Sequence, residues 1–251
     1  MELRQFEKQA LKAYKAKQWL LRKTPGQRRV RNEMHLQPEL RWWLVYGPPR
    51  SGTSYVMRLI KTCSRLYVSD WGLGMFLARI PDWLRFQSHP LHDYITFDPD
   101  RLLQDISSNI LDNAYAGDGD QLDLIYKQAG MRPRVVQILS RMWGPPERVI
   151  FCLREPAGYM ASAAKKFAHG SRERWQSLYL HSVNSYPTVG GEVLEYTSKL
   201  SLPDYLRFLA PLNFEGKRLP PFEYRGEQDR ESASEEMWAA YHRIKDLVAD
   251  G

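Results

Sequence analysis

Short apolar runs recur along the chain, and each is followed by a turn and then by a segment whose apolar residues return every three or four positions. The run over residues 42–46 ends at a Gly/Pro turn, and residues 54–63 then show helical spacing. Apolar runs of this length are typical of strands buried on both faces of a parallel sheet. The other expected strands are residues 66–69, 135–139, 149–153 and 192–197, and the other expected helices are residues 156–168, 172–185, 203–212 and 235–248.

The alternation of strands with helices predicts an α/β fold, with an open, mainly parallel sheet flanked by helices on both faces. Residues 70–130 interrupt this alternation. They are rich in Trp, Phe, His, Pro and Asp, with one expected helix near residues 100–115. Because irregular segments on a rigid scaffold often carry binding residues, we predict that residues 70–130 cover the sheet and form the substrate pocket.

The beginning of the chain differs from the rest in its charge. Residues 2–22 have helical spacing, and a connector follows up to residue 38. Residues 1–34 hold ten Lys or Arg against three Asp or Glu, so the net charge of +7 lies entirely in this segment. We predict a helical arm over residues 1–38 and a single α/β domain over residues 39–251. The basic arm either packs on the domain by its apolar side or contacts an acidic partner or a membrane surface, and we expect no nucleic-acid partner.

The composition, 43% hydrophobic and 26% charged, is that of a globular protein. No apolar run approaches the ~20 residues that span a bilayer, and residues 1–18 lack the apolar core of a signal peptide. Cys63 and Cys152, the only cysteines, lie in apolar surroundings and are expected to be buried thiols. We therefore predict a cytoplasmic protein.

The turn after the first expected strand, residues 47–54, has the character of a phosphate-binding loop. A strand, a Gly-containing loop and a helix direct backbone N–H groups and a helix N-terminus at a phosphate. Arg50 adds a cation that can bind two oxygens at once. Thr53 stands where the nucleoside-triphosphate loop G-x-x-x-x-G-K-[ST] has its Lys, which argues against ATP or GTP hydrolysis. The candidate ligands in the loop are Pro49, Arg50, Ser51, Gly52, Thr53 and Ser54.

A second motif follows about 100 residues later. Arg154 comes directly after the expected strand 149–153, where ligands bind in open α/β sheets. Pro156 begins the next helix, whose N-terminal dipole points toward the same crevice. Ser162 lies eight residues after Arg154, two turns into that helix. Arg154 and Ser162 are therefore candidates for a second phosphate.

Together the two motifs resemble those of the sulfotransferases that use 3′-phosphoadenosine 5′-phosphosulfate (PAPS). Residues 49–54 are similar to the family's 5′-phosphosulfate loop, and Arg154 with Ser162 to its 3′-phosphate motif. The resemblance implies a P-loop-like fold, PAPS as cofactor with adenosine 3′,5′-bisphosphate (PAP) as product, and no metal. It implies sulfuryl transfer to a hydroxyl or amine of a carbohydrate, lipid or small molecule.

Later matches to the family are looser. Tyr196 is similar to a tyrosine near the adenine, although Thr197 follows in place of an acidic residue. Arg225 and Gly226 resemble the segment that closes over the 3′-phosphate, without the Lys that usually stands between them. The resemblance implies that these three residues also belong to the cofactor site.

An acceptor hydroxyl needs a general base. Many family members have a catalytic His directly after the strand that residues 135–139 would match, but Ser140 and Arg141 follow here. Members that act on carbohydrates use a carboxylate after the second strand, where Asp70 stands. We predict Arg50 and Asp70 as catalytic, with His89 and His92 as alternative bases. Two other hypotheses stay open: a P-loop small-molecule kinase or NTPase, and a non-catalytic PAPS- or PAP-binding protein of the same fold.

Overall fold

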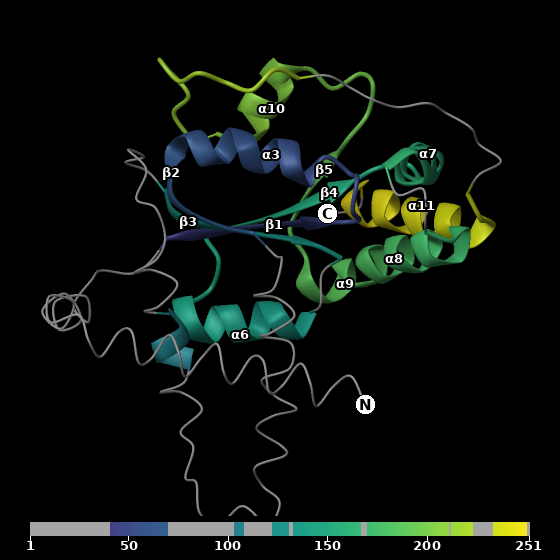
Figure 1. Cartoon of the computed structure of the whole chain (residues 1–251), viewed down its shortest axis with the longest axis horizontal. Coiled ribbons are helices and arrows are strands. Elements are labelled where there is room, and N and C mark those ends of the chain that lie inside the picture. Colours follow the sequence, from purple (N-terminus) through teal and green to yellow (C-terminus); the bar gives the residue numbers. More distant parts are fainter. Residues whose placement is uncertain are drawn as a thin grey trace, which may run out of the picture. The chain divides into compact units, whose positions relative to one another are not determined.

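The computed structural model describes residues 41–69, 103–107, 122–130, 133–166, 170–210, 212–222 and 233–249 (Figure 1). The chain divides into two compact units, residues 1–39 and residues 40–251, and all described residues belong to the second unit. The predicted arm and most of the segment 70–130 lie outside the described residues. So do the candidate residues Asp70, His89, His92, Arg225 and Gly226.

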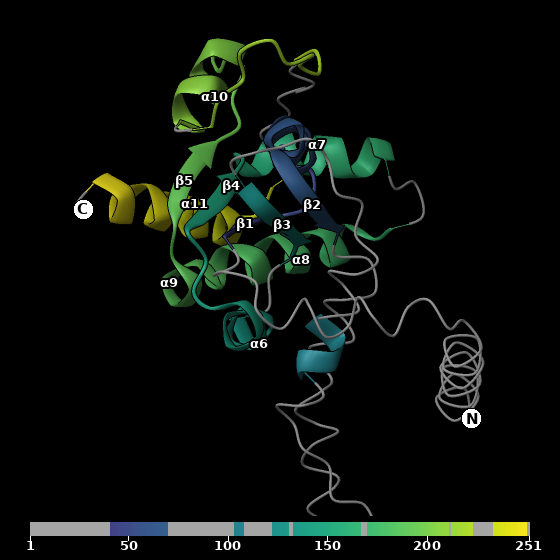
Figure 2. The ribbon, with the colours of Figure 1, turned by 90° about the vertical axis from the view of Figure 1, so that its left-hand side faces the viewer.

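The described strands form one five-stranded sheet in the order β2-β3-β1-β4-β5, with every neighbouring pair parallel. All carboxyl ends of the strands therefore lie along one edge, and β2 and β5 form the two sides of the sheet (Figure 2). This confirms the predicted open α/β fold. The strands are β1 (Trp42–Gly47), β2 (Ser64–Ser69), β3 (Leu122–Ala129), β4 (Arg148–Leu153) and β5 (Glu192–Glu195).

Helices cover both faces of the sheet (Figure 1). One face carries α3 (Thr53–Ile60), extended by the 3-10 turn η3 (Lys61–Cys63), and α10 (Leu202–Phe208). The other face carries α6 (Pro133–Trp143), α8 (Arg172–Asn184) and α9 (Tyr186–Val189). Two further helices, α7 (Pro156–Lys166) and α11 (Glu235–Ala249), pack with α8.

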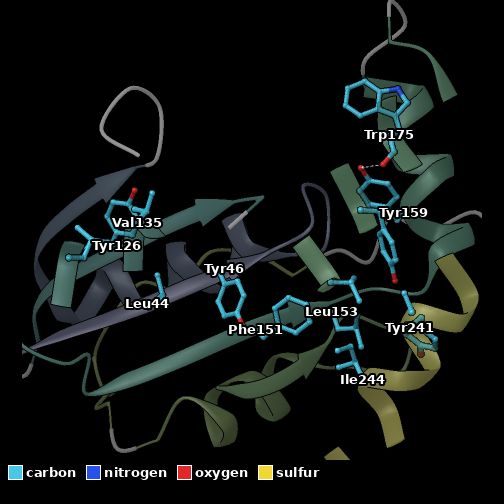
Figure 3. Close-up of a cluster of buried hydrophobic side chains, with 14 of the residues drawn as sticks. Leu44, Tyr46, Tyr126, Val135, Phe151, Leu153, Tyr159, Trp175, Tyr241 and Ile244 are labelled. Atoms are coloured by element: carbon cyan, nitrogen blue, oxygen red, sulfur yellow. Dashed lines mark hydrogen bonds between the residues drawn. The ribbon is translucent and has the colours of Figure 1, made fainter. Parts of the chain in front are cut away.

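Alternating side chains of the central strand β1 build the two halves of the core. Trp42 and Tyr46 belong to the cluster with α6 and α8, whereas Trp43 and Val45 belong to the cluster with α3 and α10. All four are almost completely buried, and burying a large apolar side chain stabilises the fold by about 1.5–3 kcal/mol. Figure 3 shows the first cluster, in which residues of β1 and β4 meet residues of α7, α8 and α11. The strand that precedes the phosphate loop is thus held from both sides.

The prediction of a strand over residues 135–139 is wrong. These residues form the middle of α6, whose inward side chains Val135, Ile138 and Leu139 have helical spacing. A five-residue apolar run fits both a buried strand and one side of a helix, so periodicity alone does not distinguish them. The third strand is β3, which lies inside the segment that the sequence predicts to be irregular. The other expected strands and helices that the structure describes are confirmed, with their ends shifted by a few residues.

Candidate functional site

The loop after β1 begins at a glycine that no other residue can replace without strain. Gly47 has φ +147°, and a Cβ on it would lie 2.2 Å from the carbonyl oxygen of Cys152 in β4. The turn is then closed from within, because the Ser51 N–H and hydroxyl both donate to the Pro48 carbonyl oxygen, at 3.2 and 2.5 Å. Ser51 is fully buried, so its hydroxyl and its N–H group both serve to close the turn.

The first turn of α3 is open to an anion. Gly52 has φ +88° and leads into the helix, whose Tyr55 and Val56 N–H groups donate to the Gly52 carbonyl. Within the described part of the chain, no side chain caps this turn and no acidic residue lies in it. The N–H groups at a helix start carry partial positive charge, and an uncapped start favours a negatively charged ligand. Thr53 is buried, whereas Ser54 is exposed.

Two cations flank this helix start. The exposed Arg50 has φ +72°, and its Nε donates to the Ser162 hydroxyl of α7 at 3.1 Å. The Nζ of Lys127, near the end of β3, donates to the Ser54 hydroxyl at 3.0 Å. The structure therefore brings together residues from both sequence motifs and adds Lys127. Sequence reasoning missed Lys127 because it missed β3, although a Lys at the carboxyl end of an apolar strand was the available signal.

Arg154 and Tyr196 lie behind the loop. Arg154 is 2% exposed, and its Nη1 donates to the Arg50 carbonyl oxygen at 2.9 Å. Its guanidinium carbon lies 5.1 Å from the centre of the Tyr196 ring. Tyr196 is also buried, and its Cδ2 is so close to Gly52 that a Cβ there would lie at 2.7 Å. Both side chains contact the protein's own loop.

Because the third strand is β3, the position where many family members have a catalytic His lies at the carboxyl end of β3. The residues at the carboxyl end of β3 are Lys127, Gln128 and Ala129, so the described residues place no His there either. Ser69, the last residue of β2, pairs with Lys127 in the register of the sheet. Asp70 follows Ser69 in the sequence and lies outside the described residues.

The described residues contain no group of three or more His, Cys, Asp or Glu side chains that could hold a metal ion. Within the same part of the chain, no helix combines the length and the apolar character needed to cross a membrane.

No protein-family model matches this chain, and no curated protein does. Among solved structures, the sulfotransferase domain of the Synechococcus PCC 7002 olefin synthase aligns at 15% identity and a TM-score of 0.37. That alignment covers 63% of this chain and 66% of the domain, just under two thirds of its length. Shikimate kinase from Bacteroides thetaiotaomicron aligns at 9% identity, with 84% and 98% coverage and a TM-score of 0.32. A gluconokinase from Sinorhizobium meliloti 1021 aligns at 14% identity, with 84% and 97% coverage and a TM-score of 0.22.

Similarities this weak do not discriminate between sulfotransferase and kinase, so the assignment depends on the site itself. A parallel strand, a turn of residues 48–52 and an uncapped helix start lie at the carboxyl edge of an open sheet, between Arg50 and Lys127. These features define a P-loop-like α/β protein, and its uncapped helix start is a candidate anion-binding site.

Proposed function

We propose that this protein is a sulfotransferase that moves a sulfuryl group from PAPS to a hydroxyl or amine of an acceptor. The contact between Arg50 of the loop and Ser162 of α7, at 3.1 Å, is the observation that supports this most strongly. It joins the two motifs that the sequence separates by more than 100 residues, as a ligand with two separate phosphates requires. A kinase loop would need its cation at position 53, where the structure has a buried Thr.

The residues present fit a phosphosulfate group. The backbone of residues 49–54, the Ser54 hydroxyl and Arg50 would hold its 5′ end, and Ser162 would hold the 3′-phosphate. The segment at Arg225 and Gly226 belongs to the proposed cofactor site as well, and Tyr196, buried against Gly52, borders it. The bound cofactor supplies an activated sulfuryl group on a phosphate leaving group.

The chain's own contribution is positive charge placed where negative charge develops. Arg50 and Lys127 lie on the two sides of the α3 N-terminus, so both are placed to stabilise charge on the departing phosphate. Groups fixed before the reaction stabilise such charge without reorganisation. Lys127 contacts Ser54 of α3, and Arg50 contacts Ser162 of α7.

We assign the general base to Asp70, with His89 and His92 as alternatives. Asp70 follows Ser69, which pairs with Lys127 at the edge of the sheet that carries the loop. A carboxylate there would take the proton of the acceptor hydroxyl on the Lys127 side of the site. The resemblance to family members that act on carbohydrates supports a carbohydrate acceptor, with a lipid or another small molecule as the alternatives.

Asp70→Asn is expected to lower sulfuryl transfer by about 100-fold or more, the usual contribution of a general base, while PAP affinity changes less than about threefold. Transfer of label from ³⁵S-PAPS to a panel of carbohydrates, lipids and small alcohols and amines measures the rate. Asp246→Asn, on the exposed surface of α11, is the matched control and should behave as the wild type. Unchanged turnover in Asp70→Asn would move the base to His89 or His92. PAP binding with no labelled acceptor would favour the non-catalytic alternative.

A further inference from the structure

Arg154 is directed at the protein's own backbone. It leaves the carboxyl end of β4, yet only 2% of it is exposed, and its Nη1 bonds the Arg50 carbonyl oxygen at 2.9 Å. Gly158 leaves room for it, since a Cβ at that position would lie 3.0 Å from the Arg154 Nε. The Arg154 backbone is held in turn, because the Tyr179 hydroxyl donates to its carbonyl oxygen at 2.8 Å. The guanidinium therefore lies beside Gly158 of α7, while Tyr179 of α8 holds the Arg154 backbone.

We propose that Arg154 and Tyr196 are positioning residues that hold the loop 48–54 in its anion-binding conformation. The inference rests on the proposed function, because that function decides which nucleotides are used as probes. It gives Arg154 a different role from direct binding of the 3′-phosphate. In this role Arg154 of the second motif supports the phosphate loop of the first motif by a hydrogen bond to its backbone.

The backbone of Arg50 needs such support. Its φ of +72° is left-handed, a conformation that residues other than glycine adopt at a cost. This conformation turns the Arg50 side chain toward Ser162 and its carbonyl oxygen toward Arg154. A hydrogen bond from a charged, buried donor is among the stronger ones in proteins. Arg154 thus stabilises the conformation in which Arg50 reaches the proposed ligand.

Tyr196 completes the support from the other side. Its backbone N–H donates to the Leu153 carbonyl at 2.7 Å, which places the residue directly beside the end of β4. Its ring packs on Gly52 and under the Arg154 guanidinium, and it meets Phe222 edge-on at 6.2 Å. A cation over an aromatic face is attracted by the ring, so Tyr196 fixes both the helix start at Gly52 and the group that bonds Arg50. The ring faces these residues, which sets it apart from an open adenine platform.

Two nucleotides separate positioning from direct binding. PAP carries both phosphates, whereas adenosine 5′-monophosphate lacks the 3′-phosphate. Arg154→Gln is expected to weaken both by the same factor, about 10- to 100-fold, because it removes one hydrogen bond from a charged donor to the shared loop. Competition titrations on the full chain measure both affinities. Arg207→Gln, whose side chain is 80% exposed on α10, is the control and should leave both unchanged.

Loss of PAP affinity alone would overturn the proposal and make Arg154 a direct ligand, and unchanged affinities would overturn it too. Tyr196→Leu should weaken both nucleotides and Tyr196→Phe should restore them, because the ring carries the contact. If Arg154→Gln does not fold, Arg154→Lys takes its place, since it keeps the charge but cannot stack as a plane on Tyr196.

Amide hydrogen exchange gives a measurement that needs no nucleotide. The hydrogen-bonded amides of Ser51, Tyr55 and Val56 should exchange about tenfold faster in Arg154→Gln, with the midpoint of global unfolding matched by choice of temperature. If the wild type binds neither nucleotide, the proposed function fails, and this exchange still decides the positioning role. Unchanged exchange in the loop would overturn it.

Discussion

Arg50→Ala is expected to lower sulfuryl transfer by about 10³-fold, the effect typical of removing a cation or donor aimed at developing charge. Arg50 is exposed, and its Nε lies on the Ser162 hydroxyl beside the uncapped start of α3. Its removal leaves Lys127 as the other cation at the loop, on the far side of that helix start. The rate of label transfer from ³⁵S-PAPS is the measurement, together with PAP affinity.

The control for this variant is Arg207→Ala, which removes the same charge from the exposed surface of α10 and should transfer at the wild-type rate. Because Arg50 adopts φ +72° without being glycine, its replacement by Ala should leave the midpoint of urea unfolding nearly unchanged. An Arg50→Ala protein that folds and transfers within threefold of the wild type would show that the loop binds no reacting group.

Gly47→Ala is expected to lower the free energy of unfolding by about 3–5 kcal/mol, the sum of a strained backbone and an overpacked contact. The added Cβ would lie 2.2 Å from the Cys152 carbonyl oxygen and 3.2 Å from the Ser51 hydroxyl. Since β1 and β4 are hydrogen-bonded neighbours at the centre of the sheet, neither can move away alone. Urea unfolding measures the change.

Gly216→Ala separates the two causes. Gly216 also has a positive φ, +69°, but a Cβ there would meet nothing within 4 Å. It should cost only about 1 kcal/mol, the price of the backbone conformation. If Gly47→Ala were as stable as Gly216→Ala, the close approach of β1 to β4 would be absent in solution.

The parts of the fold that the sequence predicts well are those where pattern and length agree. β1 and β4 are continuous apolar runs with a turn directly after them, and they are buried on both faces as expected. The loop 47–54 can be recognised from its glycines, its Arg and its hydroxyl residues. Its conformation depends mostly on residues that are close together in the sequence. Local chemistry of this kind can be predicted from one sequence.

The parts that the sequence does not predict depend on contacts between distant residues. The sequence does not predict β3 because Lys127 and Gln128 make its carboxyl end polar, and residues 135–139 fit the pattern of a strand because a short run has no clear period. The spacing of Arg154 and Ser162 does not predict their different contacts. The Ser162 hydroxyl accepts a hydrogen bond from the Arg50 side chain, whereas the buried Arg154 donates to the Arg50 carbonyl oxygen. That division follows from packing against Tyr196, which is 42 positions away from Arg154 in the chain.

The identity of the nucleotide tests the central claim most directly. Thermal unfolding of the wild-type chain should be followed with PAP alone and with ATP plus Mg²⁺, each over the same concentration range. A ligand of the folded state at about 100 times its Kd adds about 2.7 kcal/mol to stability. A sulfotransferase site with Arg50 in the loop and Thr53 in the position of the missing Lys predicts that PAP raises Tm and that ATP with Mg²⁺ does not. A rise with ATP and Mg²⁺ and none with PAP would contradict it.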